Sequence, residues 1–255
     1  MNLVCDLSLA EKYHSPSQRA RVLSEAWFGA NVYCIACDSD EVRKTPDNTK
    51  ATDFVCPKCF HRYELKTFKG RKPKTIPDGA FETMMRMVAS GGAPTLCLLE
   101  RTENWEVRGL TAIHSSFLLP DAIVKRNPLR ATAERKNWVG CNILLSRIDN
   151  DADVGVIEQG VPQPVVEVRK RFQRFLPLAG KSAGQRGWTL LTLRMVRGLR
   201  KDSFGLRDLY ALENEFAKAY PGNRHVRDKI RQQLQILRDL GVLAFAAPGE
   251  YRLLV

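Results

Sequence analysis

The sequence predicts a mixed α/β domain followed by a small helical domain that ends in a β-hairpin. Three observations support this class. Strand-like and helix-like segments alternate through the first 180 residues, three helical segments and a final Pro-Gly turn follow, and a small polar segment, LAGKSAGQRG, separates the two parts. We therefore predict domains at residues 1–180 and 181–255.

The first domain is expected to begin with a helix and to build its sheet around a second helix. Apolar residues recur at helical spacing over 17–28, and the alternating segment HRYELKTF at 61–68 indicates a strand. A second helix is expected from Asp78 to the glycine pair at 91–92. Further strands are predicted at 93–101, 104–111 and 142–146.

The second domain is expected to contain three helices, at 187–199, 206–220 and 225–240. Asn223 is placed to cap the third of these helices. Its apolar stripe consists of Val226, Ile230, Leu234 and Leu237. Two strands around a Pro-Gly turn follow at 241–254, so the domain is predicted to be a winged helix.

The charge of the chain favours a polyanionic partner. Forty Lys and Arg against 28 Asp and Glu give a formal net charge of +12, and the pI is about 9.5. Residues 182–255 hold 13 basic against 7 acidic residues, so the predicted winged helix carries half of this excess. Nucleic acid is the first candidate, although many basic proteins bind none. No apolar run is long enough to span a membrane and no targeting segment is evident, so a cytoplasmic location is expected.

Four of the seven cysteines form two Cys-x-x-Cys pairs, YCIAC and VCPKC. Each short turn can direct two thiolates at one ion, and two such turns complete a tetrahedral shell for zinc. Four thiolates leave no open position, so the ion is expected to be structural. Coincidence or a redox pair is the alternative. The predicted zinc ligands are Cys34, Cys37, Cys56 and Cys59.

A carboxylate followed by Glu-x-Lys lies among these cysteines. Asp53 is separated by ten residues from Glu64, and Lys66 follows two residues later. In a strand, residues two apart point to the same side, so Glu64 and Lys66 are expected to project together. Carboxylates are ligands for Mg²⁺, and a lysine can orient or deprotonate a water or stabilise the charged transition state. The pattern is typical of PD-(D/E)xK nucleases, although Thr52 replaces the proline and an ordinary solvated strand face is the alternative.

The third helix of the second domain carries polar side chains opposite its apolar stripe. These can contact phosphates and base edges in the major groove. The alternative is a winged helix that binds protein, which the basic excess argues against. The predicted DNA-contacting residues here are Arg224, His225, Arg231 and Gln232.

The whole chain resembles the DpnI family of methyl-directed restriction endonucleases. The segments that carry the likeness are SQRARVLSEAWF, YCIAC, TDFVCPKC, YELK, DGAFETMMRMV, NPLRATAERKNWVGCNI, RGWT and KIRQQLQILRDLGV. Similarity is weak at 39–50, 150–180 and 206–220, and in NRHVRD at the start of the third helix. The resemblance implies a PD-(D/E)xK core with a zinc insertion, and cutting of GATC when its adenine carries an N6-methyl group.

By the same resemblance, Mg²⁺ would be bound by Asp53, Glu64 and the Leu65 carbonyl, and Lys66 would complete the catalytic set. Trp138 matches the family's aromatic sensor of the methyl group. An indole ring can pack against this methyl group, because both are apolar. Without the family, Trp138 would be interpreted as a core residue.

These observations together predict a Mg²⁺-dependent type II restriction endonuclease. It is expected to act as a monomer on adenine-methylated double-stranded DNA in a prokaryotic cytoplasm, with a second methyl-DNA reader in the winged helix. The alternative is a non-catalytic sensor of methylated DNA or a transcription regulator. Retention of Asp53, Glu64 and Lys66 speaks against that alternative.

Overall fold

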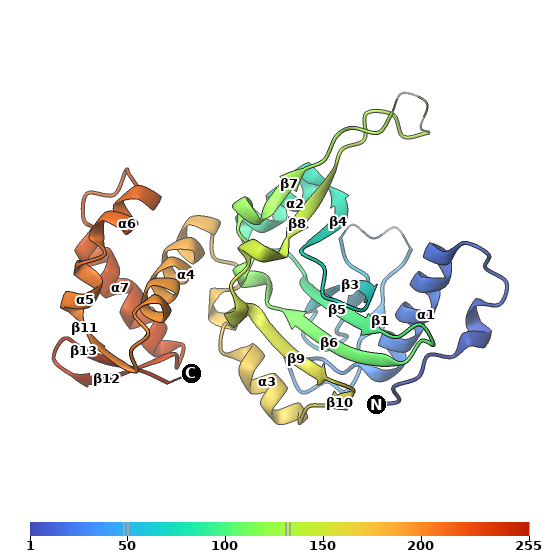
Figure 1. The fold of residues 1–255 in the computed structure, drawn as a ribbon, viewed down its shortest axis with the longest axis horizontal. Coiled ribbons are helices and arrows are strands. Elements are labelled where there is room, and N and C mark those ends of the chain that lie inside the picture. The colour runs from blue at the N-terminus through green and yellow to red at the C-terminus, as the bar shows by residue number, and fades with distance from the viewer. Residues whose placement is uncertain (48, 50, 131, 133, 255) are drawn as a thin grey trace. The chain divides into compact units, whose positions relative to one another are not determined.

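The computed structural model describes residues 1–47, 49, 51–130, 132 and 134–254 (Figure 1). The chain divides into two compact units, Met1–Gly180 and Lys181–Val255. The first is mixed α/β and the second is a small helical domain with a short sheet, so the predicted fold class is confirmed. None of the helices in the described part of the chain has the length and apolarity needed to cross a lipid bilayer.

A seven-stranded sheet forms the main layer of the first unit, in the order β1-β2-β3-β5-β6-β9-β10. Its central pair, β3 and β5, is parallel, and the other neighbours are antiparallel. The strands are β1 (Arg43–Lys44), β2 (Phe54–Val55), β3 (Arg62–Lys69), β5 (Thr95–Arg101), β6 (Val107–Ile113), β9 (Asp153–Glu158) and β10 (Val161–Pro162).

A second sheet of three strands, β4-β8-β7, forms beside it in the same unit. Its strands are β4 (Thr75–Ala80), β7 (Ile123–Lys125) and β8 (Gly140–Leu144), and helix α2 (Phe81–Ser90) follows β4 directly. The amphipathic α2 ends at Gly91, whose φ of 75° is the left-handed conformation that glycine adopts without strain.

Two further helices pack on the large sheet. Helix α1 (Pro16–Asn31) contacts β3, and α3 (Val165–Gln173) contacts β9 (Figure 1). The core between α1 and the sheet contains Leu23, Phe28, Phe54 and Tyr63, each at most 1% exposed. Short 3-10 helices connect the elements at Leu7–Ala10, Ser115–Phe117, Pro120–Ala122, Leu145–Arg147, Asn150–Ala152 and Leu176–Leu178.

The second unit packs three main helices against a three-stranded sheet in the order β11-β13-β12. The recognition-type helix α7 buries Val226, Ile230, Leu234 and Leu237, as its spacing predicts. A buried hydrogen bond of 2.7 Å from Thr189 to Gln233 joins α4 to α7. The elements are α4 (Ala183–Gly198), β11 (Ser203–Gly205), α5 (Leu206–Tyr210), α6 (Glu213–Ala219), α7 (Val226–Asp239), β12 (Leu243–Ala247) and β13 (Glu250–Leu253).

Several predicted boundaries in the second unit are wrong. The single helix expected over 206–220 is two helices, interrupted at 211–212. Helix α4 begins at Ala183, inside the expected linker, because Ser182 and Gln185 form a capping box. Asn223 does not cap α7. It accepts a 2.7 Å bond from the backbone of His225, the residue that precedes the helix.

One boundary in the first unit matters for function. The helix expected from Asp78 begins three residues later, at Phe81, and Asp78 lies on β4 instead. The sequence signal for this strand is weak because Pro77 and Gly79 flank the aspartate, and both residues are poor strand formers.

Candidate active site and metal centre

The four predicted zinc ligands lie together. Their sulfurs are all within 4.8 Å of one another, and they form the cluster of metal-binding type found within the described residues. The Cys34–Cys59 and Cys37–Cys56 sulfur pairs are each 3.6 Å apart. Thiolates about 2.3 Å from a tetrahedral zinc ion lie about 3.8 Å from one another. The donor set therefore fits zinc.

At one of the four cysteines, Cys56, the backbone favours the thiolate over the thiol. Burial opposes ionisation of Cys56, but the N–H groups of Cys59 and Lys58 point at its sulfur and lower its pKa to about 6. The Tyr63 hydroxyl lies 3.1 Å from the sulfur of Cys34. Such contacts orient the ligands of a metal.

Helix α3 fastens the first cysteine turn to the sheet. The guanidinium of Arg169 donates to the carbonyl of Cys34 at 3.0 Å and to that of Ser39 at 2.9 Å. Gln173, one turn later, donates to the carbonyl of Ala36 at 3.2 Å. The turn that holds Cys34 and Cys37 is thus part of the fold of the first unit. Because β2 ends at Val55, immediately before Cys56, the same cluster also fixes the end of the short strand that follows Asp53.

Asp53 lies at the edge of β2 with its carboxylate against β3. Its Oδ2 atom accepts a 2.8 Å hydrogen bond from the backbone N–H of Leu65, the residue between the predicted acid and amine. Burial raises the pKa of Asp53, while this hydrogen bond and the charge of Lys66 oppose the rise. Asp53 is therefore brought to the same stretch of β3 as the other two predicted residues.

Glu64 and Lys66 project from β3 to the same side and contact each other. The ammonium of Lys66 lies 2.8 Å from Oε1 of Glu64, which is only 5% exposed. It also lies 3.0 Å from Oδ1 of Asp78, across from β3 on β4. One ammonium group thus bridges two buried carboxylates from different sheets.

The burial of this cluster changes the ionisation of its members. Burial raises the pKa of Glu64 to about 8, and the negative charge of Asp78 adds to the rise against the opposing charge of Lys66. Burial also opposes the charge on Lys66, but Glu64 and Asp78 together hold the pKa of its ammonium well above the usual value. Both carboxylates thus favour the charged form of Lys66.

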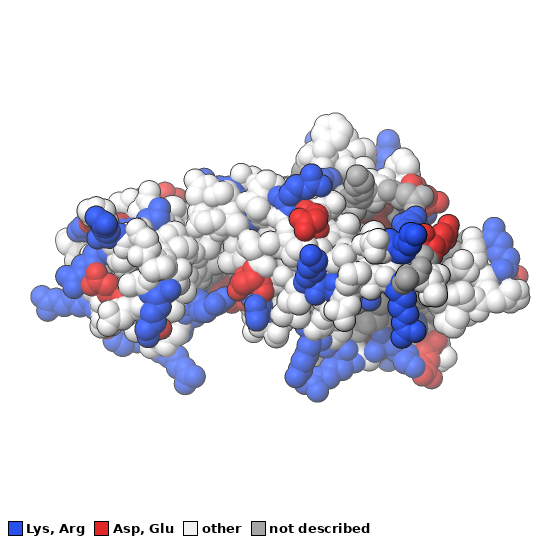
Figure 2. All heavy atoms as spheres, turned by 90° about the horizontal axis from the view of Figure 1, so that it is seen from above, with Lys and Arg blue, Asp and Glu red and all other residues white. Residues whose placement is uncertain are grey.

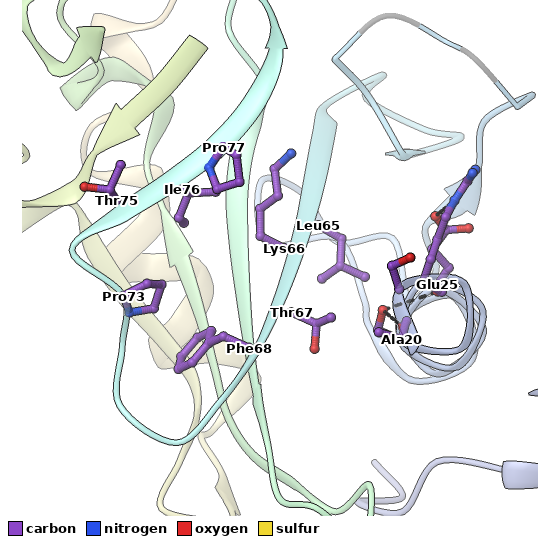
Figure 3. A pocket seen from close by; sticks show the side chains of 13 residues that line it. Ala20, Glu25, Leu65, Lys66, Thr67, Phe68, Pro73, Thr75, Ile76 and Pro77 are labelled. Atoms are coloured by element: carbon purple, nitrogen blue, oxygen red, sulfur yellow. Dashed lines mark hydrogen bonds and ion pairs between the residues drawn. The ribbon is translucent and has the colours of Figure 1, made fainter. Parts of the chain in front are cut away.

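A pocket of about 440 Å³ opens beside this cluster, between α1, β3 and the start of β4 (Figure 3). Lys66 lies in its wall together with Thr67, and α1 contributes Arg21 and Glu25, which form an ion pair of 2.7 Å. The pocket therefore combines hydroxyl groups and cations, the donors that a phosphodiester backbone requires.

Trp138 lines a separate pocket of about 320 Å³ in the first unit. Its indole packs so closely on Gly140 that a Cβ there would lie 2.8 Å from the ring. The other residues of the pocket are Ala51, Gly79, Ala80, Thr83, Met84 and Arg135. Trp138 is half-buried in this pocket, so its interpretation as a residue of the closed core is not favoured.

The predicted DNA-contacting residues of the second unit are all exposed, at or just before α7. Arg231 forms an ion pair with Asp228, and Gln232 accepts a 2.7 Å bond from Lys229. Figure 2 shows Lys and Arg side chains on the surface of both units. Because α7 turns its apolar stripe inward, these polar residues remain available to a ligand.

Asp78 and the pocket-lining residues Arg21 and Arg135 were not predicted as site residues from the sequence. Asp78 was assigned to the start of a helix, where an acidic residue is commonplace. No local sequence pattern marks Asp78, because Pro77 and Gly79 disfavour a strand, and its burial, at 7% exposed, is evident only in the fold.

The fold and the site define a protein with an α/β unit, whose four-cysteine cluster could hold zinc, and a small helical unit of helix-turn-helix type. Family models match both parts. One is described as DpnI, Dam-replacing family, and matches residues 1–181; the other is described as a Dam-replacing HTH domain and matches residues 184–253. The chain therefore belongs to the Dam-replacing DpnI family. This membership places it among the methyl-directed restriction endonucleases, and its helix-turn-helix domain identifies DNA as its partner.

Proposed function

We propose that the protein is a Mg²⁺-dependent type II endonuclease that hydrolyses double-stranded DNA at N6-methyladenine within GATC. The observation that carries the chemistry is the convergence of Asp53, Glu64 and Lys66 on one stretch of β3. Asp53 is held against the backbone of Leu65, and Glu64 contacts Lys66 at 2.8 Å. The site preference rests on membership of the DpnI family.

The donor atoms at this site fit Mg²⁺. Asp53 and Glu64 supply carboxylate oxygens, and the Leu65 carbonyl is a third hard ligand between them. Glu64 is buried and its Oε1 atom lies 2.8 Å from the Lys66 ammonium, so a bound Mg²⁺ would share this carboxylate with Lys66. When bound, Mg²⁺ supplies positive charge to the scissile phosphate and lowers the pKa of a water.

Lys66 acts as a fixed positive charge. Its carboxylate partners keep it protonated, so it orients the attacking water by donating hydrogen bonds and stabilises the charge that builds up on the phosphate. A role as general base does not fit this environment, because a base must release its proton near neutral pH.

The pocket around Trp138 is proposed to receive the methyl group of the modified adenine. Its lining of indole, Met84 and Ala80 offers apolar contact, and Arg135 can bind a nearby phosphate or base edge. An unmethylated adenine would leave part of this surface unfilled, which lowers the affinity for the unmodified sequence.

The exposed face of α7 is proposed as the second reader of methylated duplex DNA. The protein is proposed to act as a monomer. Phosphate contacts from arginines position such a helix, and Gln is a side chain able to pair with adenine. The residues proposed for this contact are Arg224, His225, Arg231 and Gln232.

A plasmid assay tests the proposal. Adenine-methylated plasmid should be cut in Mg²⁺ and left intact in excess chelator, and unmethylated plasmid should stay intact at the same protein concentration. Asp53→Ala should abolish cutting without weakening binding to methylated duplex. Asp53→Asn is the variant matched to Asp53→Ala. It also removes the negative charge, but its amide oxygen can still accept the hydrogen bond from the Leu65 N–H. Failure to nick either plasmid, together with selective binding of methylated duplex, would favour the non-catalytic sensor.

A further inference from the structure

Asp78 is a buried carboxylate that the proposed catalytic set does not include. Its side chain is 2% exposed, and its Oδ1 atom accepts bonds from the Lys66 ammonium at 3.0 Å and from the Gly79 N–H at 2.7 Å. Its Oδ2 atom is buried and meets no hydrogen-bond partner within the described residues. A buried charge this incompletely satisfied lowers stability, and such groups concentrate at functional sites.

The backbone of β4 is shaped to aim this side chain at Lys66. Asp78 pairs with Cys141 and Ala80 pairs with Gly140, so Gly79 is the extra residue of a β-bulge. Bulges re-aim side chains and are common beside active sites. Helix α2 begins immediately after the bulge, at Phe81.

The contact with Asp78 matters because Lys66 has two carboxylate partners. When the Glu64 carboxylate binds Mg²⁺, its ion pair with the Lys66 ammonium weakens. A lysine with Glu64 as its sole partner would then be released into the adjoining pocket, whose wall it already forms. Asp78 supplies a second anchor for the Lys66 ammonium, at 3.0 Å and from another sheet.

We infer that Asp78 is a positioning residue of the active site, which holds the Lys66 ammonium in place while Glu64 binds the divalent cation. The inference rests on the proposed function. It assigns Asp78 no contact with DNA or with the reacting atoms, and it makes Lys66 dependent on β4 as well as on β3.

Asp78→Asn removes the charge and keeps the shape and one acceptor for Lys66. Without the second charge, Lys66 competes with Mg²⁺ for Glu64. Isothermal titration calorimetry of the DNA-free protein at about pH 9, where Glu64 is largely ionised, should therefore show about tenfold weaker Mg²⁺ binding. Single-turnover cutting of methylated duplex at saturating Mg²⁺ and saturating protein should be about 10- to 100-fold slower, because the ammonium is less well placed. Affinity for methylated duplex, measured with Ca²⁺ in place of Mg²⁺, should stay within about twofold.

Ile143→Val is the matched control, since Ile143 is buried on β8, pairs with Ile76 of β4, and lines neither the pocket beside Lys66 nor the pocket of Trp138. It should bind Mg²⁺ and cut as the unchanged protein does. If Asp78→Asn does not fold, Asp78→Glu is measured instead. It keeps the charge but displaces it by one methylene, so it should retain Mg²⁺ binding and cut slowly.

Unchanged Mg²⁺ affinity and an unchanged cutting rate in Asp78→Asn would overturn the inference, as would a cutting rate of Asp78→Glu equal to that of the unchanged protein. These results differ from a failure of the proposed function. In that case the unchanged protein would itself not cut methylated DNA in Mg²⁺, so there would be no cutting rate with which to compare the Asp78 variants.

Discussion

Mg²⁺ binding by this protein should depend steeply on pH, because one proposed ligand holds a proton near neutrality. Burial and the neighbouring Asp78 raise the pKa of Glu64 to about 8. A carboxyl group must lose its proton before it can bind a cation. The perturbation is therefore a change of pH between 6 and 9, compared in the unchanged protein and in Glu64→Gln.

The expected size of the effect follows from the ionised fraction of Glu64. With a pKa of about 8, about 1% of Glu64 is ionised at pH 6, about 9% at pH 7 and about half at pH 8. The apparent Mg²⁺ affinity should therefore rise about tenfold from pH 6 to pH 7 and about fivefold from pH 7 to pH 8, then level off above pH 8.

Calorimetric titration of the DNA-free protein with Mg²⁺ at each pH measures this dependence directly. The protons released on binding should approach one per Mg²⁺ at pH 6 and fall toward zero above pH 9. In Glu64→Gln, binding should be weak and nearly independent of pH. A Mg²⁺ affinity of the unchanged protein that stays constant from pH 6 to pH 8 would refute the reasoning, since it would mean that Glu64 is already ionised or does not bind the ion.

The same proton affects stability without metal. In the folded state Glu64 holds its proton up to a pKa of about 8, whereas the ordinary value is 4.5. Its contribution to stability is thus fully present below about pH 4.5 and is lost as pH rises through about 8. Added Mg²⁺ should raise the melting temperature most at the high end of this range, because a bound ligand stabilises the folded state.

Two further predictions concern the pockets and the metal cluster. Gly140→Ala places a Cβ 2.8 Å from the Trp138 ring, so the ring must move. The preference for methylated over unmethylated duplex in a binding assay should then fall about tenfold. Gly184→Ala, in α4 of the second unit, should keep the preference, because its Cβ would meet nothing within 4 Å. An equal preference in both variants would contradict the proposed sensor. Cys37→Ser removes a zinc ligand and should lower the melting temperature of the first unit by several degrees, with loss of zinc in elemental analysis. A zinc-loaded variant with an unchanged melting temperature would show that the cluster does not stabilise the fold.

Local patterns in the sequence were sufficient where neighbours in the chain decide the outcome. The Cys-x-x-Cys spacing predicted a cluster whose sulfurs lie within 4.8 Å. Helical periodicity predicted the buried stripe of α7, and strand alternation predicted that Glu64 and Lys66 share a side of β3. Within one turn, helix or strand these residues are a few positions apart, so local geometry fixes their arrangement. The meeting of the two cysteine turns is different, because Cys37 and Cys56 are 19 residues apart and the fold brings them together.

Helix ends and interruptions were less well predicted. The break between α5 and α6 and the early start of α4 depend on capping and tertiary packing, which periodicity does not contain. The weak strand β4 was missed because Pro77 and Gly79 disfavour strands locally, whereas its pairing with β8 stabilises it in the folded unit.

The sequence by itself determined which residues could bind zinc, which acid and amine share a strand, and which helix face is buried. Only the tertiary structure decided that Asp78, from a second sheet, meets Lys66 at 3.0 Å, and that Trp138 lies over Gly140 in a pocket. The reason is physical. Contacts within one strand or helix follow from a fixed repeat, while contacts between sheets depend on how bulges and burial place whole strands, and this requires the packed fold.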